Sequence, residues 1–98
     1  MNNKRRKEIA KCIEMLSKKS PEIRNALEDL NDILFEEDEY RDNMPENLQG
    51  GSRYEDSEEA SDLLNEAISY LDDALDEDDS DAKLELVESA IGALNNIN

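Results

Sequence analysis

The chain has 98 residues and a net charge of −16, from 27 acidic and 11 basic side chains. This length predicts one domain, and Leu, Ile, Val and Phe supply only 21 residues, too few for a core that encloses a large active-site cavity. Apolar runs stop at two or three residues, which excludes a membrane span and a secretory signal peptide and predicts a soluble, cytoplasmic protein.

Apolar residues of the first half recur at alternating intervals of three and four, a period typical of helices. The series is Ile9, Ile13, Leu16, Ser20, Ile23, Leu27, Leu30 and Leu34. A proline in a helix interior removes a backbone hydrogen bond, yet Pro21 leaves the phase of the series unchanged. Pro21 therefore either kinks one helix or separates two, and the sequence predicts helices over about 3–19 and 21–42.

The second half repeats this spacing and predicts two further helices, over about 53–77 and 80–97. The first apolar series is Ala60, Leu64, Ala67, Leu71 and Ala74. The second is Leu84, Val87, Ala90, Ile91, Leu94 and Ile97. The acidic residues 76–79 interrupt the two, and Asp79 or Ser80 is expected to cap the last helix.

Residues 43–52 are expected to form the loop between the two central helices. Met44 precedes Pro45, which disfavours helical geometry at Met44 and ends the first long helix near Asn43. Ser52 is expected to cap the helix that follows, and Met44 and Leu48 to close the end of the core.

The two interruptions, at Pro21 and at residues 76–79, lie at similar distances along the chain from the 43–52 loop. On a pair of antiparallel helices they would therefore fall at one level, where both arms bend or fold back. The predicted fold is all-α, a long helical hairpin elaborated to a three- or four-helix arrangement, with residues 1–98 as a single domain.

Charge is divided unevenly along the chain. Residues 1–24 hold eight basic and three acidic side chains, whereas residues 25–98 hold three basic and 24 acidic ones. The basic segment can pair with the acidic remainder, within one molecule or between subunits. The surplus of carboxylates can also form a surface that repels nucleic acid and membranes and attracts basic proteins.

Polar and aromatic side chains gather at the predicted end of the hairpin. Stacking rings, guanidinium groups and amides are what a nucleotide site requires. The residues of this alternative ligand site are Tyr40, Arg41, Asn47, Arg53 and Tyr54. The other interpretation is structural: the arginines neutralise nearby acids, and the tyrosines pack against the helix ends.

The loop carries the run Asn43-Met44-Pro45-Glu46-Asn47-Leu48-Gln49, followed after two glycines by Ser52-Arg53-Tyr54-Glu55. This pattern resembles that of a family of small, acidic, uncharacterised helical proteins from bacteriophages and prophages of Gram-positive bacteria. The resemblance covers about residues 30–75; in the family a Glu precedes the Arg of the second motif, and here it is missing. It implies a phage setting and a helical hairpin, and no established activity.

The first functional hypothesis is a non-enzymatic phage protein that inhibits host defence by covering the basic, nucleic-acid-binding surface of a host protein. Its partner-binding residues are expected on the outer faces of the two central helices. They are Asp29, Asp32, Glu36, Glu37, Asp62, Glu66, Asp72, Asp73 and Asp76. The alternatives are sequestration of a nucleotide-derived immune signal at the hairpin end, and a structural module that forms homo-oligomers.

Catalytic and metal-binding chemistry is not expected. The chain has no histidine, which removes the commonest acid–base and nucleophile-activating group and a principal zinc ligand. An EF-hand that began at Asp76 would need glycine at Asp81 and glutamate at Val87. Cys12 lies beside the first apolar series and is expected in the core. No enzymatic activity, cofactor or metal is predicted.

Overall fold

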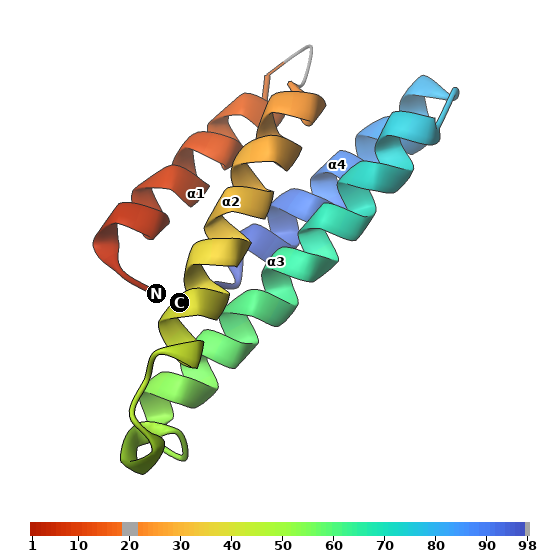
Figure 1. The fold of residues 1–98 in the computed structure, drawn as a ribbon. Helices are drawn as coiled ribbons and strands as arrows, with labels where there is room; N and C mark the ends of the chain where they lie inside the picture. Colours follow the sequence, from red (N-terminus) through yellow and green to blue (C-terminus); the bar gives the residue numbers. More distant parts are fainter. Residues whose placement is uncertain (19–21, 98) are drawn as a thin grey trace.

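The computed structural model describes residues 1–18 and 22–97, and within them the chain is helical and without strands. The helices are α1 (Asn3–Leu16), α2 (Ile23–Asp42), α3 (Ser52–Asp76) and α4 (Ser80–Asn95), with a short 3-10 helix, η1 (Glu46–Leu48), between α2 and α3. The helices run alternately up and down as a bundle (Figure 1). The predicted all-α class is confirmed, and the four α-helices of the described residues fit the predicted three- or four-helix arrangement.

The long hairpin consists of α2 and α3, which pack side by side along their length (Figure 1). At one end of this hairpin, α1 folds back along α2 and α4 folds back along α3. The prediction that both arms fold back at one level is therefore confirmed. Ser20 and Pro21 lie outside the described residues, but α1 and α2 are two separate antiparallel helices.

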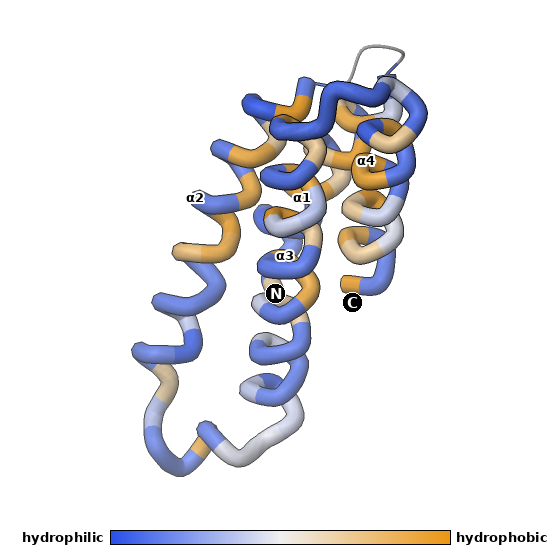
Figure 2. The backbone as a smooth tube through the Cα atoms, turned by 90° about the vertical axis from the view of Figure 1, so that its right-hand side faces the viewer, coloured by the Kyte–Doolittle hydropathy of each residue, from blue (hydrophilic) through white to orange (hydrophobic). Residues whose placement is uncertain are grey.

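The other end of the hairpin projects beyond α1 and α4, because those two helices are shorter than α2 and α3 (Figure 1). The molecule is accordingly a rod of 49 × 20 × 18 Å. Hydrophobic residues gather where the four helices lie together, whereas the projecting half is mainly hydrophilic (Figure 2). We call residues 43–51, which connect α2 to α3, the tip.

Helix α1 ends at Leu16, before the predicted end at residue 19. The backbone amide of Ser17 donates to the carbonyl oxygen of Ile13 at 2.9 Å, and the Ser17 hydroxyl donates to the same oxygen at 2.7 Å. The Glu22 amide donates to the carbonyl oxygen of Met15 at 3.3 Å. Local side-chain bonding by serine thus competes with continuation of the helix.

The predicted N-terminal cap is confirmed for α4 and wrong for α3. The Asp79 carboxylate caps α4, since Oδ1 accepts from the Asp81 amide at 3.1 Å. Helix α3 instead begins at Ser52, with Gly51 as an extended N-cap that makes no side-chain hydrogen bond. The prediction that Ser52 caps α3 is wrong, because the helix starts one residue earlier than a Ser52 cap requires.

The core lies between the four helices in their shared half. The predicted α3 series is entirely buried: Ala60, Leu64, Ala67, Leu71 and Ala74. On α1 and α2 the buried face is rotated from the predicted series, so that Cys12, Ala26 and Ile33 are fully buried while Ile13 and Leu34 are half-buried. Two apolar residues expected in the core are exposed, Leu48 at 52% and Leu84 at 49%.

The Cys12 thiol is fully buried, as predicted, and burial raises its pKa to about 12, with Asp29 and Glu8 adding to the effect. An unfolded chain loses this proton near pH 9, whereas the folded chain keeps it. The thiol therefore makes stability fall as pH rises above about 9, by about 1 kcal/mol at pH 10. Urea unfolding at pH 8 and pH 10 measures this loss of stability. The Cys12→Ala variant should lose less stability between the two pH values than the native chain, and an equal loss in both would contradict the buried thiol as its cause.

Candidate functional site

Five of the predicted partner-binding carboxylates lie on α3, and all five are exposed to solvent. They are Asp62, Glu66, Asp72, Asp73 and Asp76. The opposite face of α3 is the buried one, so these residues point away from the bundle. Within residues 1–18 and 22–97, none of the five takes part in an ion pair.

The outermost ridge of α3 carries carboxylates at helical spacing. We call this ridge the α3 stripe; its residues are Glu55, Glu59, Asp62, Glu66, Asp73 and Asp76, all exposed. With a rise of 1.5 Å per residue, the α3 stripe spans about 32 Å, so its charges are about 6 Å apart on average. Because residues three and four apart are neighbours on a helix, these like charges repel one another.

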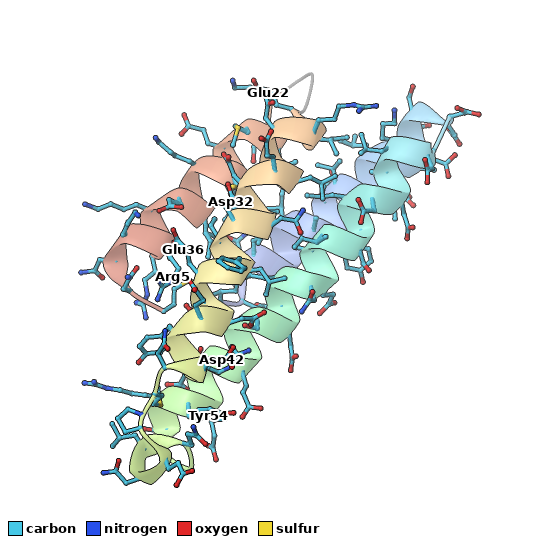
Figure 3. All side chains as sticks on the ribbon, viewed as in Figure 1. Arg5, Glu22, Asp32, Glu36, Asp42 and Tyr54 are labelled. Carbon is cyan, nitrogen blue, oxygen red and sulfur yellow. The ribbon has the colours of Figure 1, made fainter. Side chains whose placement is uncertain are left out.

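The acidic surface continues from α3 onto the α3–α4 connection and α4. Residues 52–95 contain 15 acidic and two basic side chains. On the outer face of α4, Asp81, Glu85 and Glu88 are exposed and keep the same helical spacing as the α3 stripe. Side chains ending in oxygen line this side of the molecule in Figure 3.

The predicted acidic residues on α2 lie in different surroundings, beside the basic helix α1. Lys4 Nζ is 3.9 Å from Glu36 Oε1. Asp29 and Asp32 line a shallow depression together with Lys11 and Glu8 of α1. Between α1 and α2, the basic segment therefore pairs with acidic residues of the same molecule. There the basic side chains of α1 reduce the negative electrostatic potential of the α2 carboxylates.

Glu37 is fully buried, so the prediction that it belongs to an exposed partner-binding face is wrong. Its Oε1 accepts from Arg5 Nε at 2.9 Å, and its Oε2 accepts from the Ser57 hydroxyl at 2.6 Å. The amino group of Met1 lies 3.5 Å from Oε2. Glu37 follows Leu30 by seven residues and Ile33 by four, so helical periodicity does place it on the buried face of α2.

Arg41 points inward as well, so its predicted role in an exposed ligand site is wrong. Its Nη1 donates to the carbonyl oxygen of Ser57 at 2.9 Å and to the Ser61 hydroxyl at 2.5 Å, while Nη2 pairs with Asp38 Oδ1 at 2.5 Å. The Ser61 hydroxyl donates to the same Asp38 oxygen at 2.8 Å. Arg41 thus fastens α2 to α3 just above the tip.

Tyr40 and Arg53 come together as the sequence suggests, but their neighbours come partly from α1. They line a pocket of about 440 Å³, which we call the α1–tip notch. Its lining residues are Met1, Asn2, Arg5, Arg6, Tyr40, Arg53 and Asp56. A second pocket of about 730 Å³, which we call the tip pocket, shares Tyr40 and Arg53 with the notch.

The other two residues of the predicted ligand site stand apart from both pockets. Asn47 is exposed on η1 and Tyr54 is half-buried on α3, and neither lines the notch or the tip pocket. The sequence missed Arg5 and Arg6, because only the antiparallel return of α1 brings its first turn beside Tyr40. It also missed Asp56, which lies three residues after Arg53 on α3. The asparagine cap of α1 was the available signal: Asn2 Oδ1 accepts from the Arg5 amide at 2.8 Å and fixes where α1 begins.

The basic side chains of α1 remain largely on the surface. Lys4, Arg6, Lys7 and Lys11 are exposed, and nitrogen-tipped side chains extend from α1 in Figure 3. At the end of α1, Lys18 Nζ donates to Glu22 Oε2 at 2.7 Å, which raises the pKa of the lysine and lowers the pKa of the glutamate. The molecule therefore has a basic helix on one side and an acidic pair of helices on the other.

Comparison of the chain with protein-family models, with curated proteins and with solved structures gave no match. None of the helices in the described part of the chain has both the length and the apolar character needed to cross a membrane. Three surface features can contact a partner or a ligand: the α3 stripe with its continuation on α4, the α1–tip notch and the tip pocket.

Proposed function

We propose that this chain is a non-enzymatic phage or prophage protein that inhibits a host-defence protein by covering its basic, nucleic-acid-binding surface. The contacting surface is the α3 stripe together with Asp81, Glu85 and Glu88 of α4. One observation carries the proposal: these carboxylates are exposed and, within the described residues, take part in no ion pair. The phage setting and the host cytoplasm rest on the resemblance of the loop at Asn43–Gln49.

The spacing of these charges suits a protein groove that normally holds nucleic acid. One strand of duplex DNA carries a phosphate about every 3.4 Å along the axis. The α3 stripe alone reaches about half of that linear density, and the neighbouring carboxylates of α4 raise it. A rod about 20 Å wide can therefore present its carboxylates to a groove that normally holds the phosphates of a nucleic acid.

The α2 carboxylates proposed from the sequence contribute less to this surface. Asp29 and Asp32 lie beside Lys11, Glu36 lies beside Lys4, and Glu37 is buried. An approaching basic protein meets the opposing field of α1 on that side, so the acidic side of α3 and α4 is the favoured one. Long-range attraction of this kind accelerates encounter and weakens as salt screens it.

The proposal is tested by affinity capture from a bacterial lysate with the immobilised chain, with and without added nuclease. We expect a nuclease-resistant captured protein that binds DNA or RNA, that is released by added DNA or RNA, and whose affinity falls steeply with salt. Capture that nuclease abolishes, or capture that neither salt nor nucleic acid reverses, would contradict the proposal.

Self-association is the competing use of the same charges, because α1 of one copy could contact the α3 stripe of another. Sedimentation of the purified chain at low and high salt separates the two. A monomer at both salt concentrations supports the proposal, whereas a stable oligomer that dissociates in high salt would favour the structural alternative.

A further inference from the structure

The α1–tip notch is a basic site on an acidic molecule. Arg5 and Arg6 reach it from the first turns of α1, and Arg53 reaches it from the start of α3. Its lining residues come from the start of α1 and from the projecting end of the hairpin, two parts of the chain that lie beside each other in Figure 1. In a chain of net charge −16, three guanidinium groups around one pocket are a local reversal of sign.

Arg5 is held in place by two contacts, one with a carboxylate and one with an aromatic ring. Its Nε donates to the buried Glu37, and its guanidinium carbon lies 5.8 Å from the centroid of the Tyr40 ring. Among the described residues the terminal nitrogens of Arg5 have no hydrogen-bond acceptor, although the side chain is only 10% exposed. Arg5 lines the notch, and its bond to Glu37 restrains the side chain, which lowers the entropic penalty of binding an anion.

The tip pocket supplies the apolar surface next to this basic notch. It is lined by Met44, Pro45 and Leu48 and by the two shared residues, Tyr40 and Arg53. Leu48 is 52% exposed, and its side chain and the Tyr40 ring both offer apolar contact area. A ligand with an anionic group at one end and an aromatic ring at the other would occupy both pockets across Tyr40.

We infer that the notch and the tip pocket together bind a nucleoside phosphate. The phosphate pairs with Arg5, Arg6 and Arg53, whose planar forks match phosphate oxygens, and the base packs against Tyr40 and Leu48. The Asp56 carboxylate at the notch is an acceptor for a ribose hydroxyl or a base amino group. This site is separate from the α3 stripe and does not depend on the function proposed above.

The test is calorimetric titration of the purified chain with ADP, GDP, CDP, UDP and cyclic di-AMP, and with adenosine and inorganic pyrophosphate as the two halves of a ligand. At least one nucleotide should bind at least about 10-fold more tightly than either half, because each charged hydrogen bond adds to the stacking of the base. No binding of any nucleotide at millimolar concentration, or pyrophosphate binding as tightly as every nucleotide, would overturn the inference.

Variants locate the site without disturbing the fold. Arg6→Ala and Arg53→Ala remove exposed side chains, and each should weaken nucleotide binding about 10-fold or more, since one charged hydrogen bond is lost. Lys7→Ala, an exposed α1 residue outside the notch, should leave binding unchanged. Tyr40→Phe should retain affinity and Tyr40→Ala should lose it. An equal loss for Lys7→Ala and Arg53→Ala would overturn the inference.

Discussion

Glu37→Ala is expected to lower the free energy of unfolding by about 3–5 kcal/mol, because it leaves a nearly buried guanidinium without its carboxylate. In the native chain, Glu37 is fully buried and accepts from Arg5 at 2.9 Å and from Ser57 at 2.6 Å. These bonds join α1, α2 and α3 at one point, so the loss should affect unfolding of the whole bundle. Urea denaturation followed by circular dichroism measures it.

Two further variants show whether the loss comes from the unpaired charge. Glu39→Ala removes an exposed carboxylate from the same helix and should change stability by less than about 0.5 kcal/mol. The double variant Arg5→Met/Glu37→Met should recover most of the stability, because well-packed apolar pairs replace buried ion pairs at little cost. A loss below about 1 kcal/mol for Glu37→Ala would contradict the buried position of this carboxylate.

Neutralising the α3 stripe is expected to weaken binding of the captured partner by about 30- to 1000-fold, which is about 2–4 kcal/mol for four charge contacts of about 0.5–1 kcal/mol each. The variant carries Glu59→Gln, Asp62→Asn, Glu66→Gln and Asp73→Asn. The affinity of the variant should also fall less steeply as the salt concentration rises, because fewer charges on the chain are screened. Fluorescence anisotropy of labelled chain over a salt series measures both.

The same variant should unfold at a higher urea concentration than the native chain. Like charges three and four residues apart on a helix destabilise it by about 0.2–0.5 kcal/mol per pair, and the four substitutions relieve several such pairs. Affinity and stability are therefore expected to change in opposite directions. A variant that lost both together would indicate that the α3 stripe supports the fold rather than a partner.

The α3 helix was predictable from the sequence to the level of individual core residues. Ala60, Leu64, Ala67, Leu71 and Ala74 are all buried, because a long helix with small and medium apolar residues at regular spacing has one possible packing face. The outward position of Asp62, Glu66 and Asp73 follows from the same period. For α3, local periodicity was sufficient to separate the core face from the water face.

Residues that act between helices could not be assigned in this way. Arg5 and Glu37 are 32 positions apart, and nothing in their local spacing tells that one carboxylate among many meets that guanidinium. Arg41 was expected to face a ligand, yet it finds Ser57 and Ser61 across the hairpin. Sequence periodicity predicts which face of a helix is buried. Which residue of a neighbouring helix lies opposite depends on the relative position of the two helices along their axes.

The exposed apolar residues show the same limit. Met44 and Leu48 were expected to close the end of the core; Met44 is buried, at 8% exposure, whereas Leu48 is exposed, because the hairpin projects beyond α1 and α4. The two outer helices decide this: α1 begins at Asn3, where the Asn2 side chain caps it, and α4 ends at Asn95, so neither helix covers the tip. A shift of a few residues in a helix end therefore decides whether the tip closes a core or lines a pocket.

The most direct test of the central claim is elution of bacterial proteins from DNA-cellulose by three forms of the chain. One is the native form, and one has the four α3 stripe substitutions. The third carries Glu28→Gln, Glu39→Gln, Asp42→Asn and Glu46→Gln, which remove the same number of charges from exposed positions outside the stripe. Release of a defined protein by the native and third forms, but not by the stripe variant, is the predicted result. Equal release by all three forms, or none by the native chain, would contradict the assignment of α3 as the partner-binding surface.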